Sequence, residues 1–348
     1  MKSHLVIKIR FIGLATILSI LVLHLPLNGQ DKLSPLFNSQ DPLSMKLGFV
    51  IKDFKKETND SVFLVSDLEY METDGEWESL SVNLTARGNF RKAQCYLPQI
   101  KIKTKKSARK NTLFDEDKTL KLVLPCKTKG NNNDLIVKEY LAYKLFELIS
   151  PYHFKTRLVN LYFYETDKKD KGYDLIAFLI EDDKKVAERH NAKVIKGRNL
   201  HPMRYQDTAS VRQDFFQYMI ANTDWSVYVQ HNIKALQFET GELIPVPYDF
   251  DMAGMVNAPY ATVNEELSIS SVRERLYRGF CRDESLFRHV KDEYLAMEST
   301  LSQIAKSQKD RMSPKEFNDL EKFLSQFFDI LKNDKHFKDR MLGGCRTN

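Results

Sequence analysis

The spacing of apolar residues changes part-way along this chain, and the change limits the folds open to it. Residues 99–103 and 119–124 alternate apolar and polar side chains, with lysines among the polar ones. A period of two residues predicts half-buried antiparallel strands. Apolar residues in 208–221, 284–306 and 314–331 instead recur every three or four positions, which predicts amphipathic helices. We therefore expect a sheet in the first half of the chain and helices in the second.

More elements are expected around these. Apolar residues at helical spacing predict a helix over 135–149, with Asn133 or Asp134 as its N-terminal cap and Ser150–Pro151 as its end. Asp74–Gly75 marks a turn between two strands. Further strands are expected at 61–66, 79–85, 157–164, 173–180, 232–238 and 243–245. This order of elements predicts an α+β fold.

The same order divides the chain into three parts. We expect a signal peptide over 1–29, a sheet-rich N-lobe with one helix over 30–182, and a helix-rich C-lobe over 183–348 that carries the proposed active-site loops. A length of 348 residues, of which 42% are apolar, is enough for one large domain or two lobes. The composition excludes a disordered, collagen-like or coiled-coil chain.

The N-terminus indicates export. Lys2, Lys8 and Arg10 precede a nearly continuous apolar run over 11–27, and a short apolar run after a basic head is typical of a secretory signal peptide. An uncleaved N-terminal anchor is the alternative, because the run is close to the shortest length that spans a bilayer. No later stretch of the sequence is apolar enough to insert after cleavage. We therefore expect a secreted or periplasmic protein.

Export places the four cysteines in an oxidising compartment, where disulfides form. Cys95 and Cys126 lie beside strands of one region, and Cys281 and Cys345 lie in the helical part. Pairing 95–126 and 281–345 is therefore favoured among the three possible pairings. A zinc site is the alternative, although no closely paired cysteines or histidines support it.

The charge of the chain argues against nucleic acid as a partner. The formal net charge is +6, and three of the basic residues fall in the first ten. The remainder is close to neutral, whereas a nucleic-acid binder typically has a strongly basic surface. Four arginines gather between the last strand and the next helix, where they either face an anionic ligand or lie on a solvated surface: Arg273, Arg275, Arg278 and Arg282.

Candidate catalytic residues gather between 222 and 251. Asp224 follows a helix, Asn232 enters a strand, and Asp249 and Asp251 follow the next strand. Oxygen ligands of this kind suit Mg²⁺ or Mn²⁺, which usually arrive with phosphates. Phosphoryl transfer needs an acid near the acceptor hydroxyl, and an Asn and an Asp on the metal ions. The alternative is that these acids are helix caps and turn residues.

Several short segments follow one another in an order that matches a known family. They are Arg87–Gly88–Asn89, Pro98–Lys103, Leu120–Leu124, Asp134–Leu148, the hairpin of Val159–Tyr164 and Tyr173–Glu181, Asn222–Asp224 with Asn232, and Tyr248–Asp251. In that order they resemble the motifs of the CotH-type secreted kinases, which are related to spore coat protein H. The resemblance implies a two-lobed atypical protein-kinase-like fold, with an antiparallel sheet in the N-lobe and a mostly helical C-lobe.

The resemblance also implies roles for single residues. Asp224 would be the catalytic acid that accepts or orients the acceptor hydroxyl, and the metal ligands would be Asn232, Asp249 and Asp251. The residues that contact the nucleotide would be Lys101, Lys103, Glu139 and Glu181, with Glu139 paired to one of the two lysines. For Asn232 to reach the metal, the loop 225–230 must bulge. Each residue also has a structural explanation, such as a solvated strand lysine, a helix-surface acid or a turn.

The function implied is an exported kinase that uses ATP with Mg²⁺ or Mn²⁺ and phosphorylates Ser or Thr of an envelope or extracellular protein. A second hypothesis is an exported binding or structural protein that lacks turnover, because glycine-rich phosphate loops are sparse in the sequence. A third is a metal-assisted hydrolase that uses the same acids. His231, the one histidine beside the proposed site, is expected to be a hydrogen-bonded structural residue.

Overall fold

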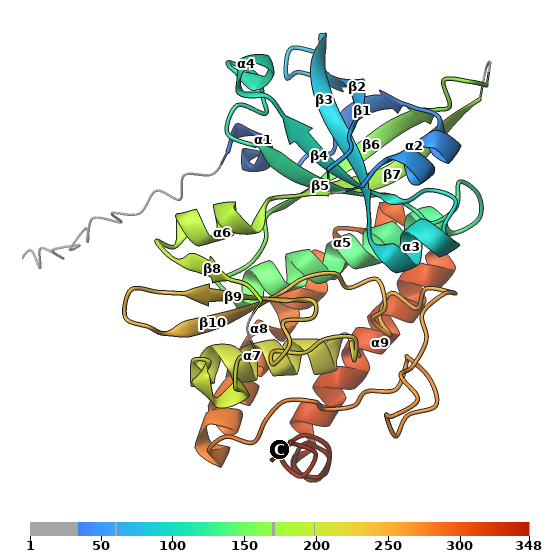
Figure 1. Cartoon of the computed structure of the whole chain (residues 1–348). Helices are drawn as coiled ribbons and strands as arrows, with labels where there is room; N and C mark the ends of the chain where they lie inside the picture. Colours follow the sequence, from blue (N-terminus) through green and yellow to red (C-terminus); the bar gives the residue numbers. More distant parts are fainter. Residues whose placement is uncertain (1–33, 60, 169–170, 198, 348) are drawn as a thin grey trace, which may run out of the picture. The chain divides into compact units, whose positions relative to one another are not determined.

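The computed structural model describes residues 34–59, 61–168, 171–197 and 199–347. The predicted signal peptide lies outside these residues. Most of the first half forms one sheet of seven strands (Figure 1). The strands are β1 (Leu43–Gly48), β2 (Leu64–Met71), β3 (Trp77–Arg87), β4 (Gln99–Thr104), β5 (Thr119–Val123), β6 (Thr156–Tyr164) and β7 (Gly172–Ile180).

This sheet is a closed barrel with the strand order β1-β2-β3-β4-β5-β7-β6. Closure comes from β1, which pairs antiparallel with β2 and parallel with β6, so that Leu43 lies opposite Val159 and Gly48 opposite Tyr164. The predicted fold class, a two-lobed kinase-like fold with an antiparallel N-terminal sheet, is therefore wrong: the sheet is mixed and closed. Closing the sheet leaves no unpaired edge strand, and the parallel pair joins segments more than a hundred residues apart in sequence.

Alternation along the strands fills the barrel and sends polar side chains outward. The inward residues of β4 are Ile100 and Ile102, which are completely buried, whereas Lys101 and Lys103 between them are partly exposed. The barrel core also takes Leu84 from β3 and Leu122 from β5. The period-two pattern of the sequence thus correctly predicted the buried face of β4 and most of that of β5, whereas β6 and β7 are buried at several consecutive positions.

Four short helices surround the barrel strands: α1 (Pro35–Asn38), α2 (Ile51–Glu57), α3 (Asn89–Gln94) and α4 (Lys106–Arg109). None of the four was predicted, because each is too short to show a helical period. The long helix α5 (Asn132–Ile149) was predicted and lies directly below the barrel in Figure 1. It begins after Asn131, so the predicted caps are wrong: Asn133 accepts a hydrogen bond from the Ile176 amide of β7, and Asp134 accepts two from Ser313.

A second, three-stranded sheet lies beyond α5, with the order β10-β9-β8. Its strands are β8 (Lys193–Ile195), β9 (Ile233–Gln237) and β10 (Leu243–Pro247). The helix α6 (Asp183–Arg189) connects β7 to β8, a 3₁₀ turn follows at Pro202–Arg204, and α7 (Asp207–Met219) leads to the loop before β9. The loop before β9 carries Asp224 and Asn232, and the segment after β10 carries Asp249 and Asp251, so these residues lie at one end of this small sheet.

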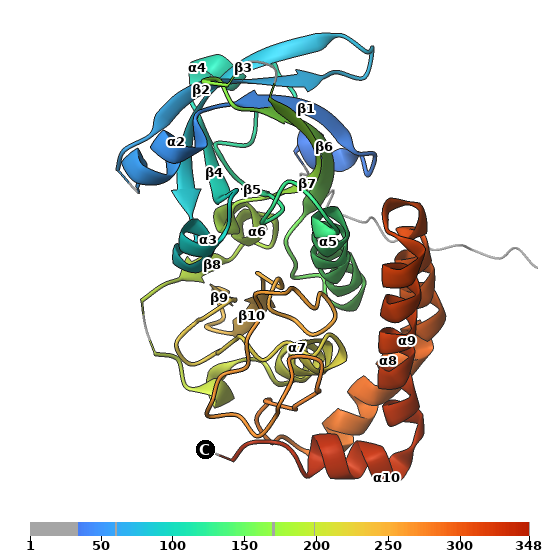
Figure 2. The same ribbon diagram turned by 90° about the vertical axis from the view of Figure 1, so that its right-hand side faces the viewer.

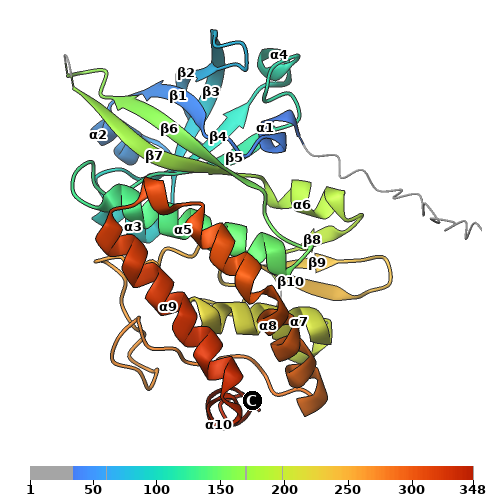
Figure 3. The ribbon, with the colours of Figure 1, turned by 180° about the vertical axis from the view of Figure 1, so that it is seen from behind.

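The C-terminal helices are α8 (Glu284–Lys306), α9 (Pro314–Lys332) and α10 (Asp334–Phe337), followed by a π-helical turn at Lys338–Leu342. Figures 2 and 3 show α8 and α9 side by side along one flank of α5 and α7. Their apolar faces form the second large core, which includes Phe215 of α7, Tyr294 of α8 and Phe327 of α9. Both long helices match their predicted bounds to within one residue, since a sustained helical period defines them well.

Two disulfides are present, Cys95–Cys126 and Cys281–Cys345. Both predicted pairs are confirmed, and they fit a protein that matures in an oxidising compartment. The first joins the end of α3 to the segment after β5, and the second joins the segment before α8 to the C-terminal segment. Within the described ranges, no helix has both the length and the apolar character needed to cross a bilayer.

Candidate functional site

The predicted catalytic acid, Asp224, is held in the loop between α7 and β9. Its amide donates to the Asn222 side chain at 3.0 Å, and Asn222 is buried. The following residues bulge outward and return, because Ser226 and His231 exchange two backbone hydrogen bonds of 2.9 and 3.0 Å. Asn232 consequently lies against Asp224, and its Nδ2 donates to the backbone O and to Oδ2 of Asp224, at 2.8 and 3.0 Å. Asn232 follows Asp224 by eight residues in the sequence, and the bulge of the residues between them brings the two side chains into contact, as expected.

His231 also contacts Asp224, with 2.8 Å between its Nε2 and Oδ1 of Asp224. This hydrogen bond raises the pKa of His231 above its ordinary value, against the opposing effect of partial burial. The Asp224 side chain remains 42% exposed. It is therefore a carboxylate fixed by two neighbours and still open to a large acceptor molecule.

Asp249 reaches the same place from the end of β10. The Tyr248 amide donates to the Asn232 carbonyl at 3.0 Å, and the Asp249 amide donates to the Tyr143 hydroxyl of α5 at 2.9 Å. Asn232 and Asp249 both have left-handed backbones, with φ of 52° and 64°. Asn and Asp tolerate this conformation better than most residues, and such conformations gather at functional sites. Asp224, Asn232 and Asp249 are thus brought together.

Basic groups of the barrel face this acidic set. Arg87, the last residue of β3, lies with its Nη2 3.6 Å from Oδ2 of Asp249. Its other terminal nitrogen, Nη1, is buried and has no hydrogen-bond partner among the residues that the structure describes. A buried guanidinium nitrogen without an acceptor is unfavourable. An anion bound beside Asp249 would supply that acceptor.

Lys121 of β5 points toward the same place. Burial first, and then the nearby charges of Arg87 and Lys234, lower its pKa to about 7, against the effect of Asp249 and Asp183. The Nζ atoms of Lys121 and Lys234 lie 4.6 and 4.8 Å from the centre of the Tyr248 ring. Three basic side chains thus crowd the space beside Asp249, an arrangement that favours a multiply charged anion.

Asp251 and Glu139 belong to an adjoining buried cluster. Arg91 of α3 lies 3.7 Å from Asp251 and 3.9 Å from Glu139, and the Tyr260 hydroxyl donates to Asp251 at 3.2 Å. Burial raises the pKa of Asp251 to about 6 and that of Glu139 well above its usual value. The predicted pairing of Glu139 with Lys101 or Lys103 is wrong, because Arg91 lies between α5 and the barrel and takes that position.

Of the other predicted nucleotide contacts, Lys103 lies over an aromatic ring and Glu181 is already in an ion pair, whereas the contact of Lys101 stays a prediction. Lys103 Nζ lies 4.2 Å from the Phe63 ring centre, on the outside of the barrel. Lys101 is opposite Lys121 in the β4·β5 ladder. Glu181 is buried, accepts a hydrogen bond from the Lys155 amide and forms an ion pair with Arg189, each at 2.5 Å. Burial raises the pKa of Glu181 to about 7.

The donor set fits a divalent cation that arrives with phosphates better than one held by protein alone. Over the residues that the structure describes, no three His, Cys, Asp or Glu side chains gather as a metal site. Asp249 and the Oδ1 atom of Asn232 offer two oxygen ligands, because only Nδ2 of Asn232 is used to hold Asp224. Mg²⁺ typically takes one or two protein oxygens together with phosphate oxygens and water.

Comparisons of this chain with protein-family models, with curated proteins and with solved structures gave no match. The similarity to the CotH-type kinases therefore stays a prediction from short motifs.

Sequence reasoning gave no site role to Arg87, Arg91 or Lys121, although Arg87 and Lys121 stand in segments that resemble the family motifs. The alternation of β4 and β5 places Lys101, Lys103 and Lys121 on one face of the sheet. The strands' tilt then decides which of them meets the loop after β10. Arg87 ends a strand directly before Gly88, whose φ is 76°. That strand-end position beside a turn was the available signal.

Proposed function

We propose that this protein is an exported phosphotransferase that uses ATP with Mg²⁺ or Mn²⁺ and phosphorylates a Ser or Thr hydroxyl of an envelope or extracellular protein. The observation that carries the proposal is the buried Nη1 of Arg87 beside Asp249, which has no hydrogen-bond partner in the described part of the chain. The proposal depends on the site and not on any kinase-like fold, because the same chemistry occurs on unrelated folds.

The basic residues would bind the polyphosphate. Arg87 presents a planar guanidinium, which suits two oxygens of one phosphate group. Lys121 supplies a compact charge from the barrel side, next to Lys234. Binding an anion here relieves the mutual repulsion of these groups, and that relief contributes to affinity.

Asp249 and Asn232 would hold the divalent cation. The cation, when bound, neutralises the charge of the phosphates that the nucleotide brings. Oδ2 of Asp249 lies 3.6 Å from Nη2 of Arg87, which is longer than a hydrogen bond, so this carboxylate can still coordinate a cation. Asn232 is oriented by its hydrogen bonds to Asp224 and so directs its carbonyl oxygen away from that acid.

Asp224 would act on the acceptor. Its carboxylate takes the proton of the acceptor hydroxyl as that oxygen bonds to the γ-phosphorus and the bond from phosphorus to ADP breaks. His231 and Asn232 keep the carboxylate in one orientation through two hydrogen bonds, and Asn232 also donates to the Asp224 backbone carbonyl. Its exposure of 42% allows a protein segment to reach it.

A non-catalytic binding protein is the second candidate. The observation in its favour is the hydrogen bonding of Asp224 itself, since both carboxylate oxygens already have partners, in His231 and Asn232. Such a protein would bind the nucleotide through Arg87 and Lys121 and would produce neither ADP nor phosphoprotein.

Substitution of the two acids separates these functions. In the exported protein, Asp249→Asn should weaken Mn²⁺-dependent ATP binding by at least about tenfold, because the cation loses its anionic ligand. Asp224→Asn should leave ATP binding within about twofold but lower phosphoryl transfer by roughly a hundredfold or more. Calorimetry measures binding, and ADP release with phosphoprotein detection measures transfer. Asp292→Asn, on the exposed face of α8, is the matched control.

Three results would contradict the proposal. ATP binding without ADP or phosphoprotein would favour the binding protein. Free phosphate in place of phosphoprotein would favour the hydrolase. Failure of ATP to bind in the presence of Mn²⁺ or Mg²⁺, with the protein folded, would exclude all nucleotide-dependent functions of this site.

A further inference from the structure

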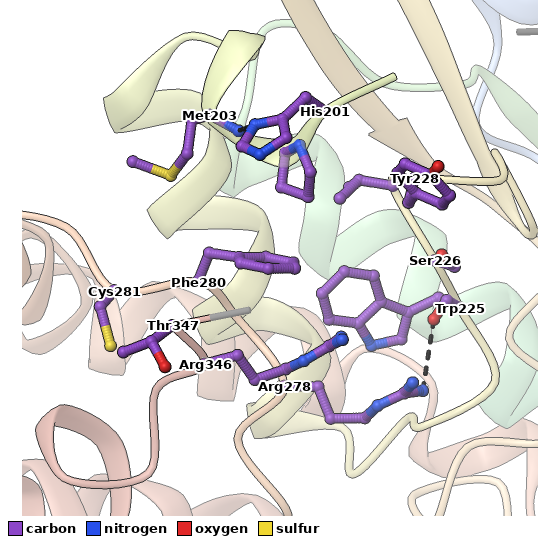
Figure 4. A pocket seen from close by; sticks show the side chains of 12 residues that line it. His201, Met203, Trp225, Ser226, Tyr228, Arg278, Phe280, Cys281, Arg346 and Thr347 are labelled. Carbon is purple, nitrogen blue, oxygen red and sulfur yellow. Dashed lines mark hydrogen bonds between the residues drawn. The ribbon is translucent and has the colours of Figure 1, made fainter. Parts of the chain in front are cut away.

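A pocket of about 670 Å³ opens next to Asp224. It is formed by the residues that follow Asp224, the turn at 201–203, the segment 278–281 and the C-terminal segment 346–347. Figure 4 shows the Trp225 and Phe280 rings on opposite sides of it, with Arg278 and Arg346 at its base. We call it the Trp225 pocket. None of its lining residues belongs to the ATP site described above.

The pocket is joined directly to the acceptor end of the proposed site. Arg278 donates through Nη1 to the backbone carbonyls of Thr223 and Trp225, the residues on either side of Asp224. The Trp225 indole donates to the Asn222 carbonyl at 3.0 Å. A polypeptide that offers its hydroxyl to Asp224 can therefore extend into the pocket within one or two residues.

The pocket is lined by two arginines, and the nearest acids that interact with them, Asp224 and Asp214, lie outside its lining. No Asp or Glu lines it, and neither Arg278 nor Arg346 forms an ion pair with a carboxylate in the described part of the chain. Arg282, four residues after Arg278, does form one, with Asp207. Burial lowers the pKa of Arg278, and the charge of Arg346 lowers it more than the charge of Asp224 raises it. Two guanidinium groups thus repel each other where an anion would fit.

Apolar side chains surround the charged base. Trp225 is nearly buried, whereas Tyr228 and Met203 are 46% and 48% exposed at the rim. The guanidinium of Arg346 lies 4.7 Å from the centre of the Phe280 ring, which fixes its position. A ligand that suits these walls has an acidic group and an apolar or aromatic group close together.

We propose that the Trp225 pocket binds an acidic side chain of the acceptor polypeptide, a carboxylate within a few residues of the phosphorylated Ser or Thr, with an adjacent apolar side chain against Trp225 and Tyr228. The proposal rests on the proposed function for the role of Asp224. It names the substrate class as acidic segments of exported proteins. Charge complementarity to Arg278 and Arg346 is the reason for choosing an acidic peptide over a basic or neutral one.

The test measures peptide binding without nucleotide. Two short fluorescein-labelled peptides are compared, one with serine followed by phenylalanine and two glutamates, and one with glutamines in place of the glutamates. The acidic peptide should bind at least about tenfold more tightly to the exported protein, because each carboxylate gains a charge-assisted hydrogen bond. Arg346→Gln should remove this preference and leave the binding of the glutamine peptide and of ATP with Mn²⁺ unchanged.

Arg204→Gln is the matched control. Arg204 is exposed, lies beside the 201–203 turn and does not line the pocket. The Arg204→Gln variant should keep the preference for the acidic peptide. Equal binding of the two peptides, or equal losses in the Arg346 and Arg204 variants, would overturn the pocket proposal even if ATP is turned over. Selective binding of the acidic peptide without any turnover would support the pocket and contradict the phosphotransferase.

Discussion

At the scale of single residues, the most informative groups are basic side chains that the fold places without a full set of partners. Lys121 has a pKa lowered to about 7, first by burial and then by Arg87 and Lys234. Within the described ranges, Arg87 keeps one buried nitrogen without a hydrogen-bond partner. Interior arrangements of this kind reduce stability unless a ligand compensates for them, and both side chains lie beside Asp249.

The Lys121 pKa predicts a pH dependence of ATP binding. Bound phosphates stabilise the ammonium form, so the pKa in the complex exceeds about 7 and binding takes up a proton above that pH. Affinity for ATP with Mn²⁺ should therefore fall as the pH rises above about 7 and should not change through this group at lower pH. Lys121→Arg, which stays charged, should bind with a flatter profile.

Calorimetry between about pH 6 and 9 compares the two proteins, and ionisation of the nucleotide itself cancels in the comparison. Lys101→Arg is the matched control, because Lys101 is the cross-strand neighbour of Lys121. Its profile should follow that of the unsubstituted protein. Parallel profiles for all three proteins would mean that Lys121 does not contact the phosphates.

At the scale of elements, the helix α5 joins the barrel to the C-terminal helices. On one side Tyr143 accepts a hydrogen bond from the Asp249 amide at the site. On the other side Lys138, whose side chain is completely buried, forms an ion pair with Glu316 of α9 at 2.5 Å. Asp134 accepts hydrogen bonds from the amide and hydroxyl of Ser313, at the start of α9. These contacts hold the start of α9 against α5.

Removing the acid of this pair should be strongly destabilising. Glu316→Ala leaves the Lys138 ammonium buried without a partner, and the expected loss in free energy of unfolding is about 3–5 kcal/mol. Adding Lys138→Met should recover most of the loss, because an apolar chain of similar length replaces the charge. Urea denaturation measures both. Asp329→Ala, on an exposed position of α9, should change stability by less than about 0.5 kcal/mol. A similar loss in the double variant and in Glu316→Ala would show that the charge is not the cause.

At the scale of the whole molecule, the two disulfides stabilise different parts of the structure. Cys95–Cys126 closes a loop with a sequence separation of 31 between α3 and the end of β5. Cys281–Cys345 spans 64 residues and holds the C-terminal segment, where the backbones of Cys281 and Arg346 are hydrogen-bonded at 2.9 Å. Only the second disulfide therefore positions a residue of the Trp225 pocket.

The two disulfides should consequently differ in their effect on function. Replacing either pair by serines should lower the free energy of unfolding by about 3–4 kcal/mol, with the longer loop at the upper end. Loss of Cys281–Cys345 should also weaken binding of the acidic peptide, because Arg346 is no longer held beside Phe280. Loss of Cys95–Cys126 should leave peptide binding unchanged. Denaturation and fluorescence anisotropy on the two double variants check this. Equal peptide affinities of the two variants would show that the Cys281–Cys345 disulfide is not needed to position Arg346.

Much of the local structure of this protein could be predicted from the sequence. The lysines of β4 alternate with Ile100 and Ile102, so the buried face of the strand is visible in the printed residues. The helices α8 and α9 have long apolar periods and match their predicted bounds. The two disulfides could also be predicted, because the two cysteines of each pair lie within one region of the chain. The strand faces and helices depend on interactions among residues that are near in sequence. The disulfides could be predicted because four cysteines allow only three pairings.

The printed residues were therefore sufficient for the long helices, for most strands and for the acids and amide at the ends of β9 and β10, but not for the short helices, β1 or β8. The tertiary structure decided the closure of the barrel through β1 and β6, and the choice of Lys121 and Arg87 as the basic groups beside Asp249. The physical reason is common to both. Pairing between distant strands, and the meeting of a strand face with a remote loop, depend on sheet tilt and on the packing of the whole core. No local pattern of residues encodes either one.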